Sequence, residues 1–292
     1  MHNNLIILAG GASSRMKKEE NTSTSNLSKE DADQANNKSK GLIGVGEQGL
    51  PFLHYLLYNA KKAGYKNIFI IIGEKDTHFK EVYGALDKGN EFHGLSVSFA
   101  RQYIPEGRTK PFGTADAVLQ TLEQFPELKT QNFTVCNSDN LYSVKALQLL
   151  RETTDSNALL GYDRDMLEYP SERIARFALM RMDSNDYMVD IIEKPAAAEV
   201  PKYQDKNGKL RVSMNVFKFD GARFYPYLKN CPVHPERNEK ELPTALLNMI
   251  GDHGQCTKVI PIAEHVIDLT SKNDIGQVRD YLKENYPTLL DW

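Results

Sequence analysis

The sequence is poor in cysteine, in long apolar runs and in excess charge of either sign. It has three cysteines among 292 residues, Cys136, Cys231 and Cys256, too few and too scattered for a disulfide framework or a zinc site. This usage is typical of a reducing compartment, and we expect a cytoplasmic protein. No apolar run approaches the roughly 18 residues of a membrane span, and the first, residues 5–9, lacks the basic flank of a secretion signal. The formal net charge of -3 indicates no general attraction to nucleic acid or to an anionic membrane, so positive charge that binds phosphate must be local.

Short β-rich segments alternate with amphipathic helical patterns through the first half of the chain. The β-rich segments are residues 5–9, 67–72, 95–100, 133–137 and 158–162. Between the first two, residues 51–63 place apolar side chains at helical spacing, and Pro51 and Gly64 suit the start and the end of a helix. This alternation predicts an α/β fold, with a parallel sheet covered by helices on both faces.

A different pattern follows Gly161. Strand-like segments at residues 177–182, 188–192 and 211–219 precede a helical pattern at residues 241–249. These segments favour an antiparallel layer added to the same sheet. We therefore expect residues 1–292 to form one domain with two lobes.

The strongest local feature is the end of the first β-rich segment. Residues 5–16 read LIILAGGASSRM, an apolar strand that runs into the turn Gly10-Gly11, two hydroxyls and Arg15. Phosphate oxygens need backbone N–H groups that no Cβ obstructs, together with a fixed cation. A plain strand-to-loop turn would explain the glycines alone, but the attached Arg15 favours phosphate binding. The spacing matches neither the Walker pattern nor the dinucleotide pattern.

Residues 8–16 resemble the triphosphate loop of the sugar-1-phosphate nucleotidyltransferases, a family of the nucleotidyltransferase superfamily. In that family a lysine follows in a Pro-Lys-x-Leu-Leu-Pro-Val-like segment, and the matching residues here are 39–45, SKGLIGV. The resemblance implies a Rossmann-like three-layer α/β/α fold with a mixed, mostly parallel sheet and an antiparallel sugar-binding lobe. It assigns Arg15 and Lys40 to the triphosphate. The nucleotide-binding residues that it implies in the loop are Leu8, Ala9, Gly10, Gly11 and Ser13.

Residues 17–39 are almost entirely polar and separate Arg15 from Lys40 more widely than is usual in the family. Such a segment buries too little apolar surface to offset the entropy lost on ordering. We interpret it as a solvated surface insertion that is mobile without ligand. Its place directly after a phosphate loop leaves the role of a lid open.

Further segments match the same family in the same order along the chain. Gln102 and residues 111–118, PFGTADAV, resemble the base-reading loop, which implies that Gln102, Gly113 and Thr114 contact the nucleobase. A helix that begins there would also leave N–H donors free at its N-terminus. Capping of that helix explains Thr114 equally well.

Asp139 follows the apolar segment 133–137, at the place where open α/β sheets bind ligands. The resemblance assigns this position to Mg²⁺. It makes Asp268, in the late segment 266–270, the second Mg²⁺ ligand. An Asx turn or a helix cap would also account for either aspartate.

The segment 191–195, IIEKP, matches the Glu-Lys-Pro element of the family. The match implies that Glu193 contacts sugar hydroxyls and that Lys194 pairs with the sugar phosphate. Ser213 and Asn215 are the polar contacts implied by the segment 211–219. Glu239 aligns with an acidic position before the last helix of the sugar lobe.

The resemblance implies a reaction in which a sugar 1-phosphate attacks the α-phosphorus of a nucleoside triphosphate and pyrophosphate leaves. A general base is not needed, because a phosphate monoester with a second pKa of about 6 is mostly dianionic at pH 7. Arg15 and Lys40 would neutralise the β- and γ-phosphates, Lys194 would hold the nucleophile, and Mg²⁺ would assist. The partners are thus small phosphorylated substrates, with no nucleic acid and no membrane, and a homo-oligomer is allowed.

Three alternatives stay open. Molybdopterin and cytidylyl transferases have a similar glycine loop but lack the Glu-Lys-Pro element. A catalytically silent regulatory subunit would keep the fold and bind a nucleotide sugar. An unrelated α/β binding protein would require that all the ordered matches arise by chance.

Overall fold

The structure, a computed structural model, describes residues 1–11, 16–17, 28–193 and 195–292. The strands are β1 (Asn4–Leu8), β2 (Asn67–Gly73), β3 (Asn90–Phe92), β4 (Leu95–Gln102), β5 (Asn132–Asn137), β6 (Asn140–Leu141), β7 (Asn157–Asp163), β8 (Leu179–Met182), β9 (Met188–Ile192), β10 (Arg211–Val212), β11 (Val216–Asp220), β12 (Thr257–Ile262) and β13 (Ile267–Asp268). The α-helices are α1 (Lys29–Asn37), α2 (Phe52–Lys62), α3 (His78–Tyr83), α4 (Thr114–Gln124), α5 (Val144–Glu152), α6 (Ser171–Ile174), α7 (Gly221–Lys229), α8 (Leu242–His253) and α9 (Asp274–Asn285). Short 3-10 helices are η1 (Lys40–Leu42), η2 (Glu47–Gly49), η3 (Pro126–Lys129), η4 (Arg164–Met166) and η5 (Val200–Tyr203).

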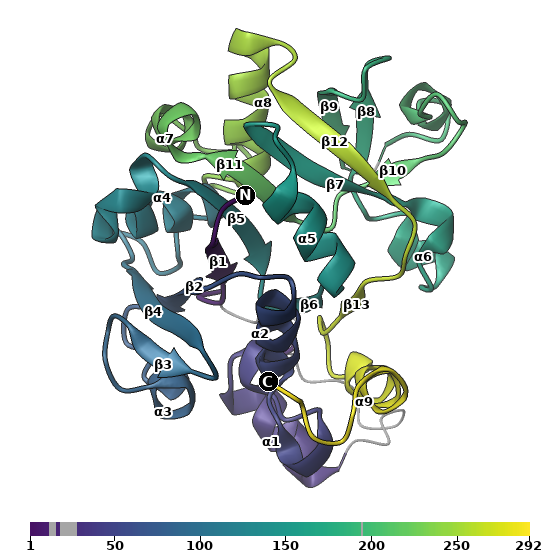
Figure 1. Cartoon of the computed structure of the whole chain (residues 1–292). Coiled ribbons are helices and arrows are strands. Elements are labelled where there is room, and N and C mark those ends of the chain that lie inside the picture. The colour runs from purple at the N-terminus through teal and green to yellow at the C-terminus, as the bar shows by residue number, and fades with distance from the viewer. Residues whose placement is uncertain (12–15, 18–27, 194) are drawn as a thin grey trace.

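A central sheet organises the described part of the chain (Figure 1). Its 11 strands run in the order β3-β4-β2-β1-β5-β11-β7-β10-β8-β9, and β12 pairs with β7. Strands β4, β2, β1 and β5 are mutually parallel neighbours, whereas β11 joins β5 in the antiparallel sense. Beyond β7, strands β10, β8 and β9 pair antiparallel. The expected α/β fold, with a mixed and mostly parallel sheet and an added antiparallel layer, is confirmed.

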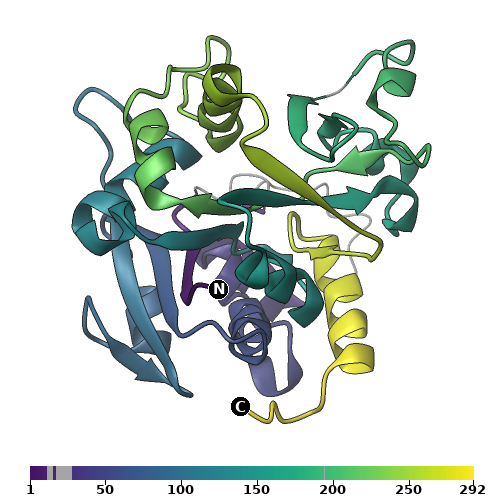
Figure 2. The ribbon, with the colours of Figure 1, turned by 45° about the horizontal axis from the view of Figure 1, so that its top comes forward.

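The sheet is buried on both faces. The side chains of a strand alternate between the faces, and apolar clusters cover each of them. In β1, Leu5 and Ile7 belong to one apolar cluster and Ile6 to another. The first cluster contains α2 and α5, and the second contains α4, α7 and α8. Figure 2 shows helices on both sides of the sheet. This arrangement gives the three layers of a Rossmann-like fold.

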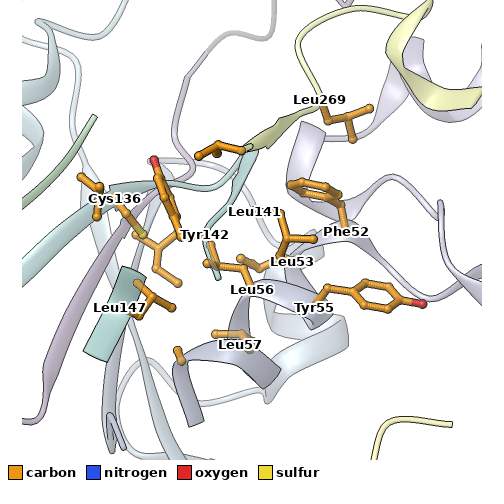
Figure 3. Packing of buried hydrophobic residues seen from close by; sticks show 14 of the residues in the cluster. Phe52, Leu53, Tyr55, Leu56, Leu57, Cys136, Leu141, Tyr142, Leu147 and Leu269 are labelled. Carbon is orange, nitrogen blue, oxygen red and sulfur yellow. The ribbon is translucent and has the colours of Figure 1, made fainter. Parts of the chain in front are cut away.

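Helix α2 shows how the sequence pattern produces this packing. Its residues Phe52, Leu53, Leu56 and Leu57 are all fully buried, at the spacing that places side chains on one face of a helix. They pack against the segment around Leu141 that follows β5 (Figure 3). Pro51 occupies the N-cap and the helix ends at Lys62, close to the expected limits of 51–63.

One expected strand is divided. We predicted a continuous strand at residues 211–219, but β10 and β11 are separated by residues 213–215. Asn215 has a φ of 55°, a left-handed conformation that Asn tolerates better than most residues and that breaks a strand. The interruption comes after Ser213, whose N–H still donates to the carbonyl oxygen of Ala178 at 3.1 Å and so continues the pairing of β10 with β8.

The second half of the polar insertion also differs from expectation. Instead of a solvated loop, α1 forms behind Ser28, whose Oγ accepts from the backbone N–H of Asp31 at 3.1 Å. Asp31 is buried and forms an ion pair with Arg279 of α9, and Ala35 is fully buried. The helix is thus held by polar contacts rather than by a wide apolar face, which the low apolar content of the segment did not suggest. Residues 18–27 lie outside the described residues, so mobility of the insertion stays a prediction.

Two further observations concern the cysteines and the membrane. The three thiols Cys136, Cys231 and Cys256 are free. In the described part of the chain, the structure contains no helix with both the length and the apolar character of a membrane span.

Candidate active site

The carboxyl ends of β1 and β5 form the centre of the site. These strands are parallel neighbours and end at Leu8 and Asn137. The N–H of Ser138 donates to the carbonyl oxygen of Leu8 at 3.1 Å, so that the two strand ends stay together as the chain leaves the sheet. The Gly10-Gly11 turn and Asp139 therefore lie at the same edge of the sheet, where open α/β sheets bind ligands.

A first cavity of about 390 Å³ opens at this edge. It is lined by every described residue that we expected to contact the nucleotide, by Lys40 and by Asp139. The lining residues are Leu8, Ala9, Gly10, Gly11, Lys40, Ile71, Gln102, Lys110, Pro111, Gly113, Thr114, Ala117, Asn137, Ser138, Asp139 and Glu239. Glu239, which precedes α8, thus lines the first cavity.

Gln102 and Gly113 are fixed to each other at one end of the first cavity. The buried Gln102 side chain donates through Nε2 to the carbonyl oxygen of Gly113 at 3.0 Å and to Asp116 Oδ2 at 3.2 Å. Gly113 has a φ of 105°, and a Cβ there would collide with the backbone of Lys240, whose nitrogen would be 2.8 Å away. Glycine at this position lets the loop before α8 close over the start of α4.

Thr114 does not cap its own helix. Its hydroxyl accepts a hydrogen bond from the N–H of Leu242, the first residue of α8, at 3.0 Å. The free N–H donors expected at the start of α4 are also partly used, because the N–H of Ala115 donates to the carbonyl oxygen of Lys240 at 2.9 Å. The start of α4 therefore contacts the start of α8. This contact could not be predicted, because the two helices are far apart in the sequence.

Lys40 and Asp139 form an ion pair inside the first cavity. Lys40 Nζ lies 2.8 Å from Asp139 Oδ2, with side chains only 11% and 21% exposed. Lys40 begins η1, and the next residue, Gly41, packs against Ser138, so a Cβ at position 41 would be 3.5 Å from the Ser138 Cβ. The short 3-10 turn thus sets the Lys40 ammonium directly over the end of β5.

Asp268 reaches the same place through a second, very short sheet. Strands β6 and β13 pair antiparallel with Asp268 opposite Asn140, and the N–H of Leu269 donates to the carbonyl oxygen of Asp139 at 2.8 Å. Burial, and then the negative charge of Asp139, raises the pKa of the Asp268 carboxyl. The two aspartates that sequence reasoning singled out are brought together.

The two carboxylates fit a divalent ion that also binds substrate. Among the described residues, no group of three or more His, Cys, Asp or Glu side chains could hold a metal ion. Mg²⁺ is commonly held by one or two carboxylates and completes its shell with water and substrate phosphates. Asp139 and Asp268 supply that kind of partial shell, and their mutual repulsion favours a cation between them.

A second cavity of about 760 Å³ adjoins the first and shares Asn137 and Asp139 with it. The residues expected there, Glu193, Ser213, Asn215 and Asp268, all line it. Ser213 Oγ accepts from the N–H of Asn215 at 3.2 Å, and Glu193 is paired with Arg237.

Several charged residues of the two cavities were not predicted. Arg173, Arg176 and Arg237 line the second cavity, and Lys110 lines the first. Lys110 directly precedes the PFGTADAV segment, which could have drawn attention to it. The three arginines lie outside every matched motif and carried no such signal. Conversely, Ser13, Arg15 and Lys194 were predicted but lie outside the described residues.

Together, these features describe an α/β protein with two adjoining cavities at the carboxyl edge of its parallel strands. The chain belongs to the nucleotidyl transferase family, because the model of that family matches residues 33–289. The matched range excludes the Gly10-Gly11 turn, so the family assignment does not depend on the predicted phosphate loop. Membership of the family supports nucleotidyl transfer as the activity.

Proposed function

We propose that the protein transfers a nucleotidyl group from a nucleoside triphosphate to a sugar 1-phosphate and releases pyrophosphate. The observation that carries this proposal is the meeting of two cavities at Asp139. A transferase needs a donor and an acceptor side by side, with the means to control negative charge between them. Lys40, Asp139 and Asp268 stand at that junction.

The triphosphate would occupy the first cavity. Its base would lie against Gln102, Gly113 and Thr114, and its phosphates would extend over the Gly10-Gly11 turn toward Lys40. We assign Arg15 and Ser13 to the same phosphates from sequence alone. Backbone N–H groups, together with a lysine that can leave Asp139 for a phosphate, favour this orientation.

The acceptor would occupy the second cavity. Glu193, Ser213 and Asn215 offer polar groups for sugar hydroxyls, and Lys194 is assigned to the sugar phosphate from sequence alone. The polar side chains that line this cavity support a sugar as the acceptor. Glu193 among them belongs to the Glu-Lys-Pro element, which molybdopterin and cytidylyl transferases lack, and this favours the proposal over those activities.

The chemistry asks these residues for positioning and for charge neutralisation. The acceptor phosphate needs no base, because it is mostly dianionic at neutral pH. Asp139 and Asp268 would hold Mg²⁺, which supplies electrostatic stabilisation for the transferred and departing phosphates. Lys40 would stabilise the departing pyrophosphate. We further propose that residues 1–292 act as one domain in the cytoplasm, with a homo-oligomer allowed.

The test is a matrix of nucleoside triphosphates against sugar 1-phosphates, with pyrophosphate release as the measurement. We expect Mg²⁺-dependent release for at least one pair and none when either substrate is omitted. Asp139→Asn protein serves as the inactive control. Release that is independent of the sugar phosphate would contradict a sugar acceptor. Tight binding of a nucleotide sugar without any turnover would favour the silent regulatory subunit.

A further inference from the structure

Arg173 of α6 joins two carboxylates on the wall of the second cavity. Its Nη2 lies 2.8 Å from Asp268 Oδ2, and its Nη1 lies 2.6 Å from Asp274 Oδ1. The guanidinium carbon also lies 4.3 Å from the centroid of the Tyr169 ring. With 23% of its side chain exposed to the cavity, Arg173 is held firmly but is not sealed from a ligand.

The two carboxylates have different roles. Asp274 Oδ2 accepts from the N–H of Thr270 at 3.0 Å and from the N–H and Oγ of Ser271 at 2.6 and 3.0 Å. These bonds tie Asp274 to the turn before α9. Asp268 instead accepts from Thr270 Oγ1 and lies opposite Asn140, the residue next to Asp139, in the β6–β13 pair. Arg173 therefore pairs with one carboxylate that has a structural role, Asp274, and with one that is a proposed metal ligand, Asp268.

Both proposed metal ligands are paired with cations in the structure. Lys40 occupies Asp139 and Arg173 occupies Asp268, each at 2.8 Å. Positive charges this close oppose the entry of a divalent cation. An incoming phosphate removes the opposition when it draws the cation to itself. By linkage, phosphate then strengthens metal binding and metal strengthens phosphate binding by the same factor.

We propose that Arg173 exchanges partners: it holds Asp268 in the absence of substrates and binds the phosphate of the acceptor once Asp268 binds the metal. The guanidinium fork suits this exchange, because Nη1 can stay on Asp274 while Nη2 turns to a phosphate oxygen. The inference rests on the proposed function, since it assumes the metal site at Asp139 and Asp268. It adds a phosphate-binding residue that the family motifs do not contain.

Arg176 provides a matched control. It lines the same cavity and forms no ion pair with any residue that the structure describes. Removal of either arginine takes one positive charge from the cavity, but only Arg173 contacts a proposed metal ligand. A difference between the two variants therefore reports the contact and not the general charge of the site.

The experiment measures Mn²⁺ binding to the full-length protein by electron paramagnetic resonance, with and without inorganic phosphate as the probe anion. In wild-type protein we expect weak binding of Mn²⁺ alone and stronger binding with phosphate. Arg173→Met should bind Mn²⁺ alone about tenfold more tightly and should show a smaller enhancement by phosphate, because only the Lys40–Asp139 pair then remains to be opened. Arg176→Met should bind Mn²⁺ alone with an affinity much nearer that of wild type. Arg173→Gln, which can still hydrogen-bond to Asp274, should act like Arg173→Met and serves if that variant does not fold.

The outcomes separate this inference from the proposed function. Wild-type protein that binds no Mn²⁺ under either condition would overturn the metal site and the inference with it. Normal Mn²⁺ binding that Arg173→Met and Arg173→Gln leave unchanged would overturn the inference alone. Equal tightening in the Arg173 and Arg176 variants would also overturn it, because the effect would then come from net charge.

Discussion

Lys40 Nζ lies 2.8 Å from Asp139 Oδ2, although 99 residues separate them in the chain. The contact joins the segment expected to bind the triphosphate to the carboxylate expected to bind the metal. Each group balances the charge of the other, so the pair is neutral overall. Substrates and metal would replace this internal pair, which makes both residues sensitive points for mutation.

Asp139→Asn should abolish turnover without unfolding the protein. The substitution removes the negative charge of a proposed metal ligand but keeps the backbone carbonyl that accepts from Leu269. We expect kcat to fall by about 10³ or more, with an unchanged thermal unfolding midpoint. Asp165→Asn is the control, because Asp165 is 70% exposed and lines neither cavity. An Asp139→Asn enzyme with the wild-type rate would rule out the metal assignment.

Lys40→Met should weaken the use of the triphosphate more than the use of the acceptor. Loss of one charge-assisted contact to phosphate lowers kcat/KM for the triphosphate by about tenfold to a hundredfold. Lys110→Met is a matched control, since Lys110 lines the same cavity but forms no ion pair with a described residue. Steady-state kinetics with each substrate varied will measure both effects. A wild-type kcat/KM for the triphosphate in Lys40→Met would place Lys40 outside the phosphate site.

Gly113→Ala should damage both stability and nucleotide binding. The new Cβ would meet the backbone of Lys240 and would also impose a side chain on a φ of 105°. Gly107→Ala isolates the second effect, because Gly107 has a φ of 79° with nothing within 4 Å of a Cβ. We expect a loss of about 1 kcal/mol in the control and a further 1–3 kcal/mol or so at Gly113. The free energy of unfolding in urea will measure both losses. Equal losses in the two variants would show that the Lys240 backbone moves aside from the new Cβ at little cost.

Stability should fall as the pH falls from about 6.5 to 4. Burial, and to a lesser extent the charge of His93, lowers the pKa of His54 to about 4 from its ordinary value of 6.5. The unfolded chain therefore binds a proton in this window and the folded chain does not, so acid favours unfolding. The expected loss from this residue is about 2 kcal/mol between pH 7 and pH 5.

His54→Gln tests this expectation, because an amide can keep a hydrogen bond to Tyr83, which lies 3.0 Å from His54 Nδ1. The unfolding free energy of the variant should vary less with pH than that of wild type. His78→Gln, at a residue 60% exposed, should retain the wild-type slope. If His54→Gln shows the wild-type slope as well, His54 is not the source of the acid sensitivity.

The sheet could be predicted because its strands carry strong local signals. β1 and β2 are apolar on both faces, and few other structures use runs such as residues 67–72. The same logic placed Asp139, since a polar residue that ends a buried strand must lie at the edge of the sheet. The prediction of one strand over residues 211–219 was wrong, because a single residue in the left-handed conformation, Asn215, does not change the hydrophobic pattern of the sequence.

The assembly of the site could not be predicted in the same way. Asp268 approaches Asp139 through strands of two residues each, which are too short to show an alternating pattern. Thr114 finds its partner 128 residues away, and Arg173 lies in a helix of four residues. These contacts depend on how whole helices and strands pack against one another, which the local sequence pattern does not predict.

Helix α1 has a consequence for how Lys40 keeps its place. Two residues of α1 hold its surroundings together. Asp31 forms an ion pair with Arg279 of α9. Gln34 Oε1 accepts from the N–H of Gly44 at 2.9 Å, so α1 contacts the chain on the far side of Lys40 as well as leading into it. Lys40 is thus supported by α1, and α1 in turn is held by α9 from the C-terminal part of the fold.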